Sequence, residues 1–212
     1  MKHLKRQKMP KNWPIARKGT KFVVKPSSNV IGGIPLLLFV RDMLNIAQNR
    51  KEVKKAIHKK NILINGFAAK EDKQAILLFD VVSIVPSKKN YKLVLNETGK
   101  FSLEETKETG SKISKVVDKK ILKGKKTQLN LLDGRNYLSE TKCNTNDSVS
   151  VDFESKKIIK CLPLKEKASV LVFAGKHVGS VGTVNKITEK MVELNLGKQN
   201  ANVLIKQLMV VA

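Results

Sequence analysis

Cysteine, histidine and acidic residues are all scarce in this chain of 212 residues. The two cysteines, Cys143 and Cys161, are too few for a disulfide framework and lack the Cys/His spacing of a zinc site. The three histidines, His3, His58 and His177, lie far apart with no carboxylate or nucleophile partner beside them. There is also no G-x-x-x-x-G-K-[ST] loop and no H-E-x-x-H motif. The sequence therefore predicts no enzyme, metal, cofactor or small-molecule substrate, and a reducing compartment.

Long apolar runs are missing as well. The longest, residues 34–40, is interrupted by Pro35 and falls far short of the roughly 18 residues that span a bilayer. No apolar segment of the secretory-signal kind follows the basic N-terminal residues. We therefore expect no membrane association. With 41% hydrophobic residues, the chain is expected to bury a core in one or two domains, or three if they are small all-β modules.

Positive charge is what the chain has in excess, with 42 Lys and Arg against 18 Asp and Glu, a formal net charge of +24. Sixteen of these cations and only two acids, Asp42 and Glu52, fall within the first 60 residues. Such a field favours a polyanionic partner, and nucleic acid is the obvious class.

Residues 1–25 contain no acid, and a segment of this kind can remain an open, solvated basic tail. However, Trp13, the single tryptophan, and the run 22–24 place large apolar side chains inside it. These residues indicate a basic arm with anchors of its own, which orders when phosphates neutralise its charge. Trp13 is expected either to stack on a base or to anchor the arm to protein.

Two helices and a β-hairpin are predicted between residues 36 and 85. One helix spans about 36–48. A second begins after Asn49, with Glu52 placed for a capping box, and runs to about residue 60. Its basic residues lie opposite its apolar face, which predicts either a cationic ridge or a solvated helix face. A strand ending in Asn65-Gly66 and a β run over 75–85 follow, so the unit is read as α-α-β-β.

The rest of the chain is read as β-structure with regularly spaced turns. Strands are expected near 91–95, 121–122, 129–132 and 148–153, while residues 104–120 could be helical or extended. Four runs, at 169–173, 182–187, 191–196 and 202–211, are expected to form a small barrel. The glycines at 175, 179 and 182 either shape a tight turn or let another backbone come close, with Lys176 and His177 at the loop tip.

Several of these stretches resemble known RNA-binding modules. The glycine series resembles the KOW motif of ribosomal and transcription-elongation proteins. Residues 36–85 resemble the S-four-type RNA-binding domain: Arg41 stands where that family has its helix-one arginine, and residues 62–66 match its Val-x-Val-Asn-Gly signature. Phe79-Asp80 replaces the usual Gly-Asp.

Motifs outside these modules extend the resemblance to essentially the whole chain. The arm motifs at 3–6 and 17–22, and residues 128–136, resemble the small-subunit ribosomal protein four family of the archaeal and eukaryotic "e" type. Leu132 replaces a usual His, and residues 27–31 lack a usual Gly-Pro-His run.

The resemblance implies an α+β, multi-domain protein. Its expected parts are a basic N-terminal arm (1–35), a small S-four-type α-α-β-β module (36–86), a central β-rich domain (87–165) and a C-terminal SH3-like KOW β-barrel (166–212). The implied function is that of a structural constituent of the small ribosomal subunit, bound to rRNA and neighbouring ribosomal proteins in the cytoplasm, and not a homo-oligomer. Two alternatives remain: a transient RNA-modifying or assembly factor, and a KOW-type transcription factor that binds polymerase.

The expected RNA-binding residues form three groups. Those of the arm are His3, Lys5, Arg6, Lys8, Trp13, Arg17, Lys18 and Lys21. Those of the helical module are Arg41, Lys51, Lys54, Lys55, His58, Lys59 and Asn65. Those of the β-domains are Lys125, Arg135, Asn136, Gly175, Lys176 and His177.

Overall fold

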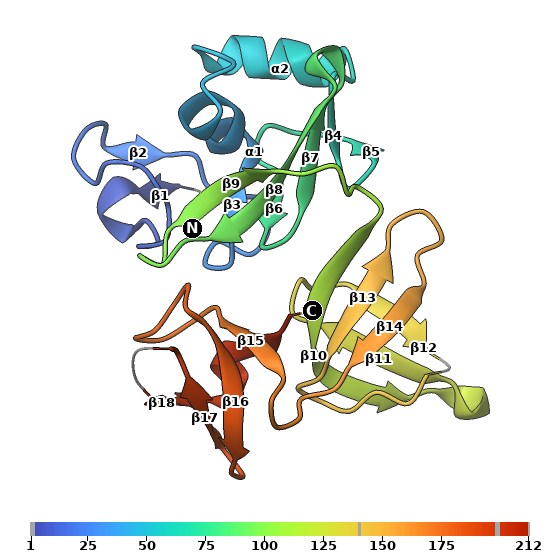
Figure 1. Ribbon diagram of the computed structural model, residues 1–212. Helices are drawn as coiled ribbons and strands as arrows, with labels where there is room; N and C mark the ends of the chain where they lie inside the picture. The colour runs from blue at the N-terminus through green and yellow to red at the C-terminus, as the bar shows by residue number, and fades with distance from the viewer. Residues whose placement is uncertain (1–2, 140, 198–199, 212) are drawn as a thin grey trace. The chain divides into compact units, whose positions relative to one another are not determined.

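The computed structural model describes residues 3–139, 141–197 and 200–211, and its fold is mostly β with few helices (Figure 1). The chain forms two compact units. Unit 1 consists of Met1–Leu95 and Lys100–Thr109, and unit 2 of Asn96–Gly99 and Gly110–Ala212. None of the described helices is long and apolar enough to cross a bilayer.

The basic N-terminal segment is folded onto the core of unit 1. Strand β1 (Leu4–Lys5) pairs antiparallel with β2 (Phe22–Val23), and the 3₁₀ turn η1 (Arg6–Lys8) follows β1. Leu4, Met9 and Trp13 are buried in the same hydrophobic cluster as the helices of unit 1. The apolar residues within this basic segment therefore anchor it to the core of unit 1. Of the two roles expected for Trp13, stacking on a base and anchoring the arm to protein, the structure shows the second.

The first helix is shorter than predicted. After β3 (Gly33–Pro35), α1 (Leu36–Leu38) continues as the π-helix η2 (Phe39–Met43) and stops, whereas the sequence predicted a helix to residue 48. The Leu44 amide donates to the Phe39 carbonyl at 3.0 Å, and Asn45 takes a positive φ of 53°. Asparagine tolerates this left-handed conformation at the end of a helix, so the turn terminates there.

Helix α2 (Arg50–His58) begins at the predicted cap. The Asn49 side chain accepts a hydrogen bond from the Glu52 amide at 3.0 Å, and Glu52 accepts one from the Gln48 amide at 2.8 Å. Val53 and Ile57 are buried against the core. The predicted division into an apolar and a basic face is confirmed.

The main sheet of unit 1 has the strand order β5-β4-β7-β8-β9. Its strands are β4 (Ile62–Ile64), β5 (Phe67–Ala68), β7 (Val81–Ile84), β8 (Lys89–Leu95) and β9 (Phe101–Glu105), with the 3₁₀ turn η3 (Val85–Ser87) between β7 and β8. Asn65 and Gly66 have φ values of 52° and 82°, so the predicted Asn-Gly turn is confirmed. Because β8 and β9 extend this sheet, it continues past the boundary that the sequence placed after residue 86.

The predicted β run over 75–85 is two strands in two different sheets. Strand β6 (Ala75–Leu77) pairs with β3, while β7 belongs to the main sheet. Between them Phe79 has a φ of 63°, and the Asp80 carboxylate accepts a hydrogen bond from the Leu77 amide at 2.7 Å. The turn at Phe79 and Asp80 divides the predicted β run into two strands. The apolar pattern of residues 75–85 alone did not indicate this division.

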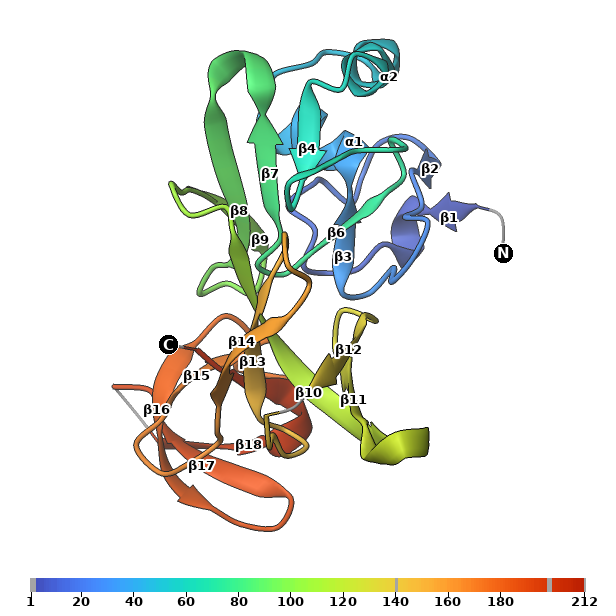
Figure 2. The same ribbon diagram turned by 90° about the vertical axis from the view of Figure 1, so that its right-hand side faces the viewer.

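Unit 2 contains two antiparallel sheets (Figure 2), each of five strands. Each sheet has its own hydrophobic cluster. The first has the order β12-β11-β10-β13-β14, and its strands are β10 (Ser111–Ile121), β11 (Thr127–Leu131), β12 (Asn136–Ser139), β13 (Ser148–Asp152) and β14 (Ile158–Leu162). The 3₁₀ turn η4 (Lys123–Lys125) joins β10 to β11. Residues 104–120, which the sequence left open, are extended where they form β9 and β10.

The second sheet of unit 2 has the order β18-β17-β16-β15-β19. Its strands are β15 (Ser169–Val172), β16 (Val181–Ile187), β17 (Met191–Asn195), β18 (Asn200–Leu204) and β19 (Leu208–Val210). They lie at the predicted positions, except that the last predicted run is divided by the 3₁₀ turn η5 (Ile205–Gln207).

A buried lysine links the two sheets of unit 2. Lys115 of β10 donates hydrogen bonds from Nζ to the carbonyl oxygens of Ile205 and, at 2.9 Å, of Leu208. Burial of the ammonium group lowers the pKa of Lys115 to about 8 from its ordinary value of 10.5.

This pKa predicts a pH dependence of stability. Above about pH 8 the folded chain loses the Lys115 proton while the unfolded chain retains it, so the free energy of unfolding rises by about 1 kcal/mol per pH unit up to pH 9. Urea denaturation from pH 7 to 9 measures it, and the rise is absent in Lys115→Met. The comparison stops at pH 9 because burial raises the pKa of the Cys161 thiol from 9.0 to about 12, which acts in the opposite direction above that pH. Equal slopes in the two proteins would contradict the prediction.

Candidate nucleic-acid interface

The exposed face of α2 is a ridge of cations. Lys51, Lys54, Lys55, His58 and Lys59, here called the α2 ridge, are all exposed, and they surround the solvent side of a helix whose other side is buried. The sequence predicted this set, since 3.6 residues per turn separate it from the apolar positions.

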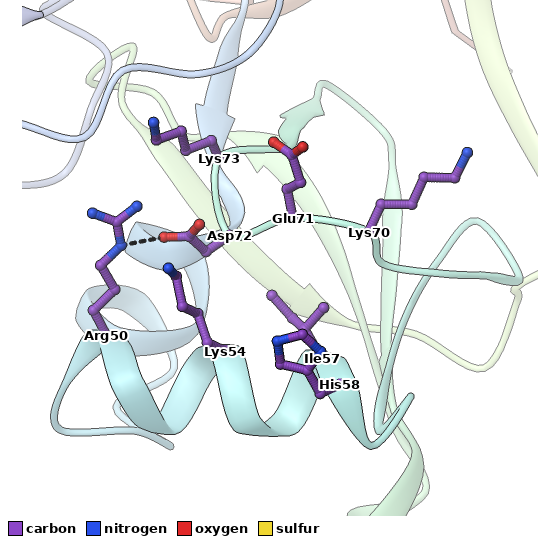
Figure 3. Close-up of a pocket in the computed structure, with 8 residues that line it drawn as sticks. All are labelled: Arg50, Lys54, Ile57, His58, Lys70, Glu71, Asp72 and Lys73. Carbon is purple, nitrogen blue, oxygen red and sulfur yellow. Dashed lines mark hydrogen bonds and ion pairs between the residues drawn. The ribbon is translucent and has the colours of Figure 1, made fainter.

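Beside the ridge lies a pocket of about 300 Å³, between α2 and residues 70–73 (Figure 3). Arg50 donates from Nε to Oδ2 of Asp72 at 2.5 Å, and the Asp72 side chain is only 7% exposed. In Figure 3 Lys54 extends from the helix toward the segment that carries Asp72. The residues that line the pocket are Arg50, Lys54, Ile57, His58, Lys70, Glu71, Asp72 and Lys73.

Backbone hydrogen bonds fix the wall opposite α2. The amides of Leu36 and Leu37 donate to the carbonyl oxygens of Gln74 and Asp72, both at 2.9 Å, and the Ser27 amide donates to that of Lys73 at 2.8 Å. This wall of the pocket is therefore held in place by the backbone of unit 1 itself. Three of the pocket's cations, Arg50, Lys70 and Lys73, were not predicted. Lys70 and Lys73 were missed because only this docking brings residues 70–73 beside α2, and Arg50, at the start of α2, because its partner Asp72 is 22 residues away in the sequence.

The cations of the arm divide into exposed residues and residues used internally. His3, Lys5, Lys8, Lys18 and Lys21 are exposed. Arg6 donates to the carbonyl oxygens of Ala16 and Thr20, at 2.6 and 2.8 Å, and so holds residues 16–20 in place. Arg17 is exposed and donates to the Met9 carbonyl oxygen at 3.2 Å.

Arg41 is part of an ion pair, with its Nη2 2.9 Å from Oδ2 of the adjacent Asp42. Both side chains are about one-third exposed. The neighbouring carboxylate offsets part of the charge that the sequence assigned to RNA binding at this position.

The candidates in unit 2 lie on two turns. Arg135 and Asn136 are exposed where β11 turns into β12. Asp133 of this turn accepts a hydrogen bond from the Arg135 amide and forms a buried ion pair with Lys112 at 3.4 Å. The side chain of Lys125 lies outside the described part of the structure.

On the glycine loop after β15, Lys176 is exposed and His177 is half-buried. Gly175 has a φ of 96°, and a Cβ there would lie 2.6 Å from Oε1 of Gln207. The end of the Gln207 side chain is flexible and can shift, so it is the positive φ that requires glycine at 175, and this residue shapes the turn. Among the described residues, no group of three His, Cys, Asp or Glu side chains is placed to hold a metal ion.

Comparisons with known proteins agree over most of the chain. The model of "Ribosomal family S4e" matches residues 87–158, and that of the "RS4NT (NUC023) domain" matches residues 1–28. The small ribosomal subunit protein eS4 of Methanocella arvoryzae is 37% identical over 87% of this chain and 80% of its own length. That of Methanothermobacter thermautotrophicus is 38% identical over 88% and 79%. The chain belongs to the S4e family of ribosomal proteins.

The fold of the S4e family is present as well. The crystal structure of the 30S ribosomal protein S4e from Thermoplasma acidophilum matches with a TM-score of 0.73 and 23% identity, covering 85% of this chain and 95% of that chain.

Trp13 and Asn65, both expected among the RNA-binding residues, are buried in the protein. Trp13 is 1% exposed and donates from Nε1 to the Gly33 carbonyl oxygen at 3.0 Å, so its ring is closed to a base. Asn65 is also 1% exposed. Its side-chain Nδ2 donates a hydrogen bond to Oδ1 of Asp80, and its Oδ1 accepts one from the backbone amide of Val81, both at 2.9 Å. The interpretation of these two as RNA-binding residues is corrected: they stabilise the fold, because their polar groups are satisfied internally.

The role of Trp13 as an anchor predicts the effect of Trp13→Phe. The lost hydrogen bond leaves the Gly33 carbonyl unpaired and a smaller ring underfills the site, so the free energy of unfolding falls by about 1–3 kcal/mol. The RNA affinity of the folded variant stays within about twofold of wild type, since the ring does not face solvent. Urea denaturation and filter binding measure the two quantities. A large loss of affinity without loss of stability would restore the stacking role.

Proposed function

We propose that this protein is a structural constituent of the small subunit of the cytoplasmic ribosome and binds rRNA through the α2 ridge, the adjacent pocket and the exposed cations of the arm. The observation that carries the proposal is the α2 ridge beside a cation-lined pocket, in a chain whose relatives are small ribosomal subunit proteins eS4. The proposed role is structural and not enzymatic, in line with the family.

Affinity in this account comes chiefly from the neutralisation of phosphates. Each lysine or arginine that meets a phosphate releases condensed counterions, which makes binding strong at low salt and weak at high salt. The ridge supplies several such groups on one rigid helix. Arg50, oriented by Asp72, presents a fixed guanidinium at the pocket, where planar donors suit a phosphate oxygen pair.

The proposed parts are a basic arm over 1–35, an S-four-type module that begins at residue 36 and whose sheet extends through β8 and β9, a central β-rich domain over 110–165 in place of the expected 87–165, and a KOW-type barrel over 166–212. Support comes from the helix-plus-hairpin arrangement of α2, β4 and β5, and from the five-stranded antiparallel sheet β15 to β19. Neighbouring ribosomal proteins are the proposed protein partners, with no second copy of this chain among them. Neither alternative raised by the sequence, an RNA-modifying or assembly factor or a polymerase-binding factor, gains support from the matched relatives.

The ridge is tested by Lys54→Glu with Lys55→Glu in the full chain. We expect about ten- to a hundredfold weaker binding to small-subunit rRNA at about 0.1 M salt, and a slope of log affinity against log salt that is shallower by about 1.5, since two phosphate contacts are lost. Filter binding over a salt series measures both.

The matched control is Lys100→Glu with Lys107→Glu, which makes the same change of charge at two exposed positions of unit 1 outside α2, the pocket and the arm. It is expected to change affinity by less than about threefold and to leave the slope unaltered. Equal effects of the two variants would remove the ridge from the interface.

A further inference from the structure

The β10–β11 hairpin of unit 2 extends beyond the support of β13. Strand β10 pairs with β13 only from Ser111 to Lys115, whereas it pairs with β11 from Val116 to Ile121. The turn is closed by a hydrogen bond from the Leu122 amide to the Lys126 carbonyl oxygen at 2.8 Å. Figure 2 shows β10 and β11 running out to this turn at one end of their sheet.

The end of this hairpin concentrates positive charge. Residues 119–126, Lys-Lys-Ile-Leu-Lys-Gly-Lys-Lys, contain five lysines and no acid. Lys120, Lys123 and Lys126, here called the hairpin tip, are exposed, and Ile121 between them is 73% exposed.

Lys119 has a different position from the hairpin tip. Its Nζ donates to the Cys143 carbonyl oxygen at 3.1 Å, and its amide donates to the Asp118 carboxylate at 2.8 Å. The bond to Cys143 ties the stem of the hairpin to the segment between β12 and β13, whereas the bond to Asp118 is local to β10.

The backbone at the tip is open to close approach. Gly124 has a φ of 78°, and a Cβ added there would meet nothing within 4 Å. The turn therefore needs glycine for its conformation only, and another chain can reach it without displacing protein atoms.

We propose that the hairpin tip is a second RNA-binding surface, in which Lys120, Lys123 and Lys126 contact backbone phosphates of the rRNA. This inference rests on the proposed function but on a different unit of the protein. Three cations with no acid among them repel one another, and a polyanionic backbone relieves that repulsion at several points at once. An RNA backbone offers a charge at every nucleotide, which a row of closely spaced lysines matches.

The test compares two triple variants of the full chain in filter binding to small-subunit rRNA over a salt series. The hairpin variant is Lys120→Glu, Lys123→Glu, Lys126→Glu. The control, Lys165→Glu, Lys186→Glu, Lys190→Glu, makes the same change of charge at exposed positions of unit 2 outside the hairpin. We expect the hairpin variant to bind about tenfold more weakly, with a slope shallower by about two to three, and the control to bind within about threefold of wild type with its slope retained.

Nuclease footprinting on the same complexes locates the contact. The hairpin variant should lose protection of one rRNA segment that the control variant still protects. Equal affinities and footprints for the two variants would overturn the proposal. A hairpin variant that binds rRNA like wild type but fails to join the assembled subunit would also overturn it, because that result would indicate a protein partner for the hairpin tip. If wild-type protein shows no preference for small-subunit rRNA over unrelated RNA, the proposed function itself fails, which separates the two outcomes.

Discussion

Self-repulsion among 42 basic side chains is the constraint on which the rest of this structure depends. The chain meets it by placing most cations at the surface and using buried acids as internal clamps. Asp72 orients Arg50, Asp133 holds Lys112, and Asp80 closes the turn between β6 and β7. Asp147 accepts hydrogen bonds from the amides of Asn144 and Leu164. These four carboxylates thus stabilise the fold, and the chain as a whole keeps its net charge of +24.

The same constraint explains how the N-terminal segment is held. A run of nine cations without an acid has no electrostatic reason to stay folded on a basic protein. Burial of Leu4, Met9 and Trp13 supplies the opposing free energy, and the Arg6 guanidinium uses its donors on carbonyl oxygens of the same segment. Apolar burial and internal hydrogen bonding together allow exposed lysines to be displayed on an ordered scaffold.

What the sequence predicted well was local. Helix α2, its Asn49 cap, its two faces and the Asn65-Gly66 turn each depend on residues within a few positions of one another, and each is present. The early end of the first helix at Asn45 and the break at Phe79 depend on positive φ values that non-glycine residues rarely signal.

The parts of the site that sequence reasoning missed depend on distant contacts. Trp13 is buried because its indole meets Gly33, twenty residues away, and the pocket cations at 70 and 73 lie beside α2 because backbone hydrogen bonds dock residues 72–74 against residues 36–37. The family resemblance supplied Asn65 as a motif residue, but its amide is used within the protein. Motif residues can therefore mark the fold of a module and leave its contacts to exposed neighbours.

The most direct test of the central claim is the stoichiometry of this protein on ribosomes. Lysate of the source cells is sedimented through a sucrose gradient, the protein is quantified against other small-subunit proteins by mass spectrometry, and bound RNA is sequenced after ultraviolet crosslinking. The account predicts about one copy per small subunit, retained in translating ribosomes, with crosslinks in one dominant cluster of small-subunit rRNA. A protein that sediments free or far below one copy per subunit, with crosslinks scattered over other transcripts, would contradict it.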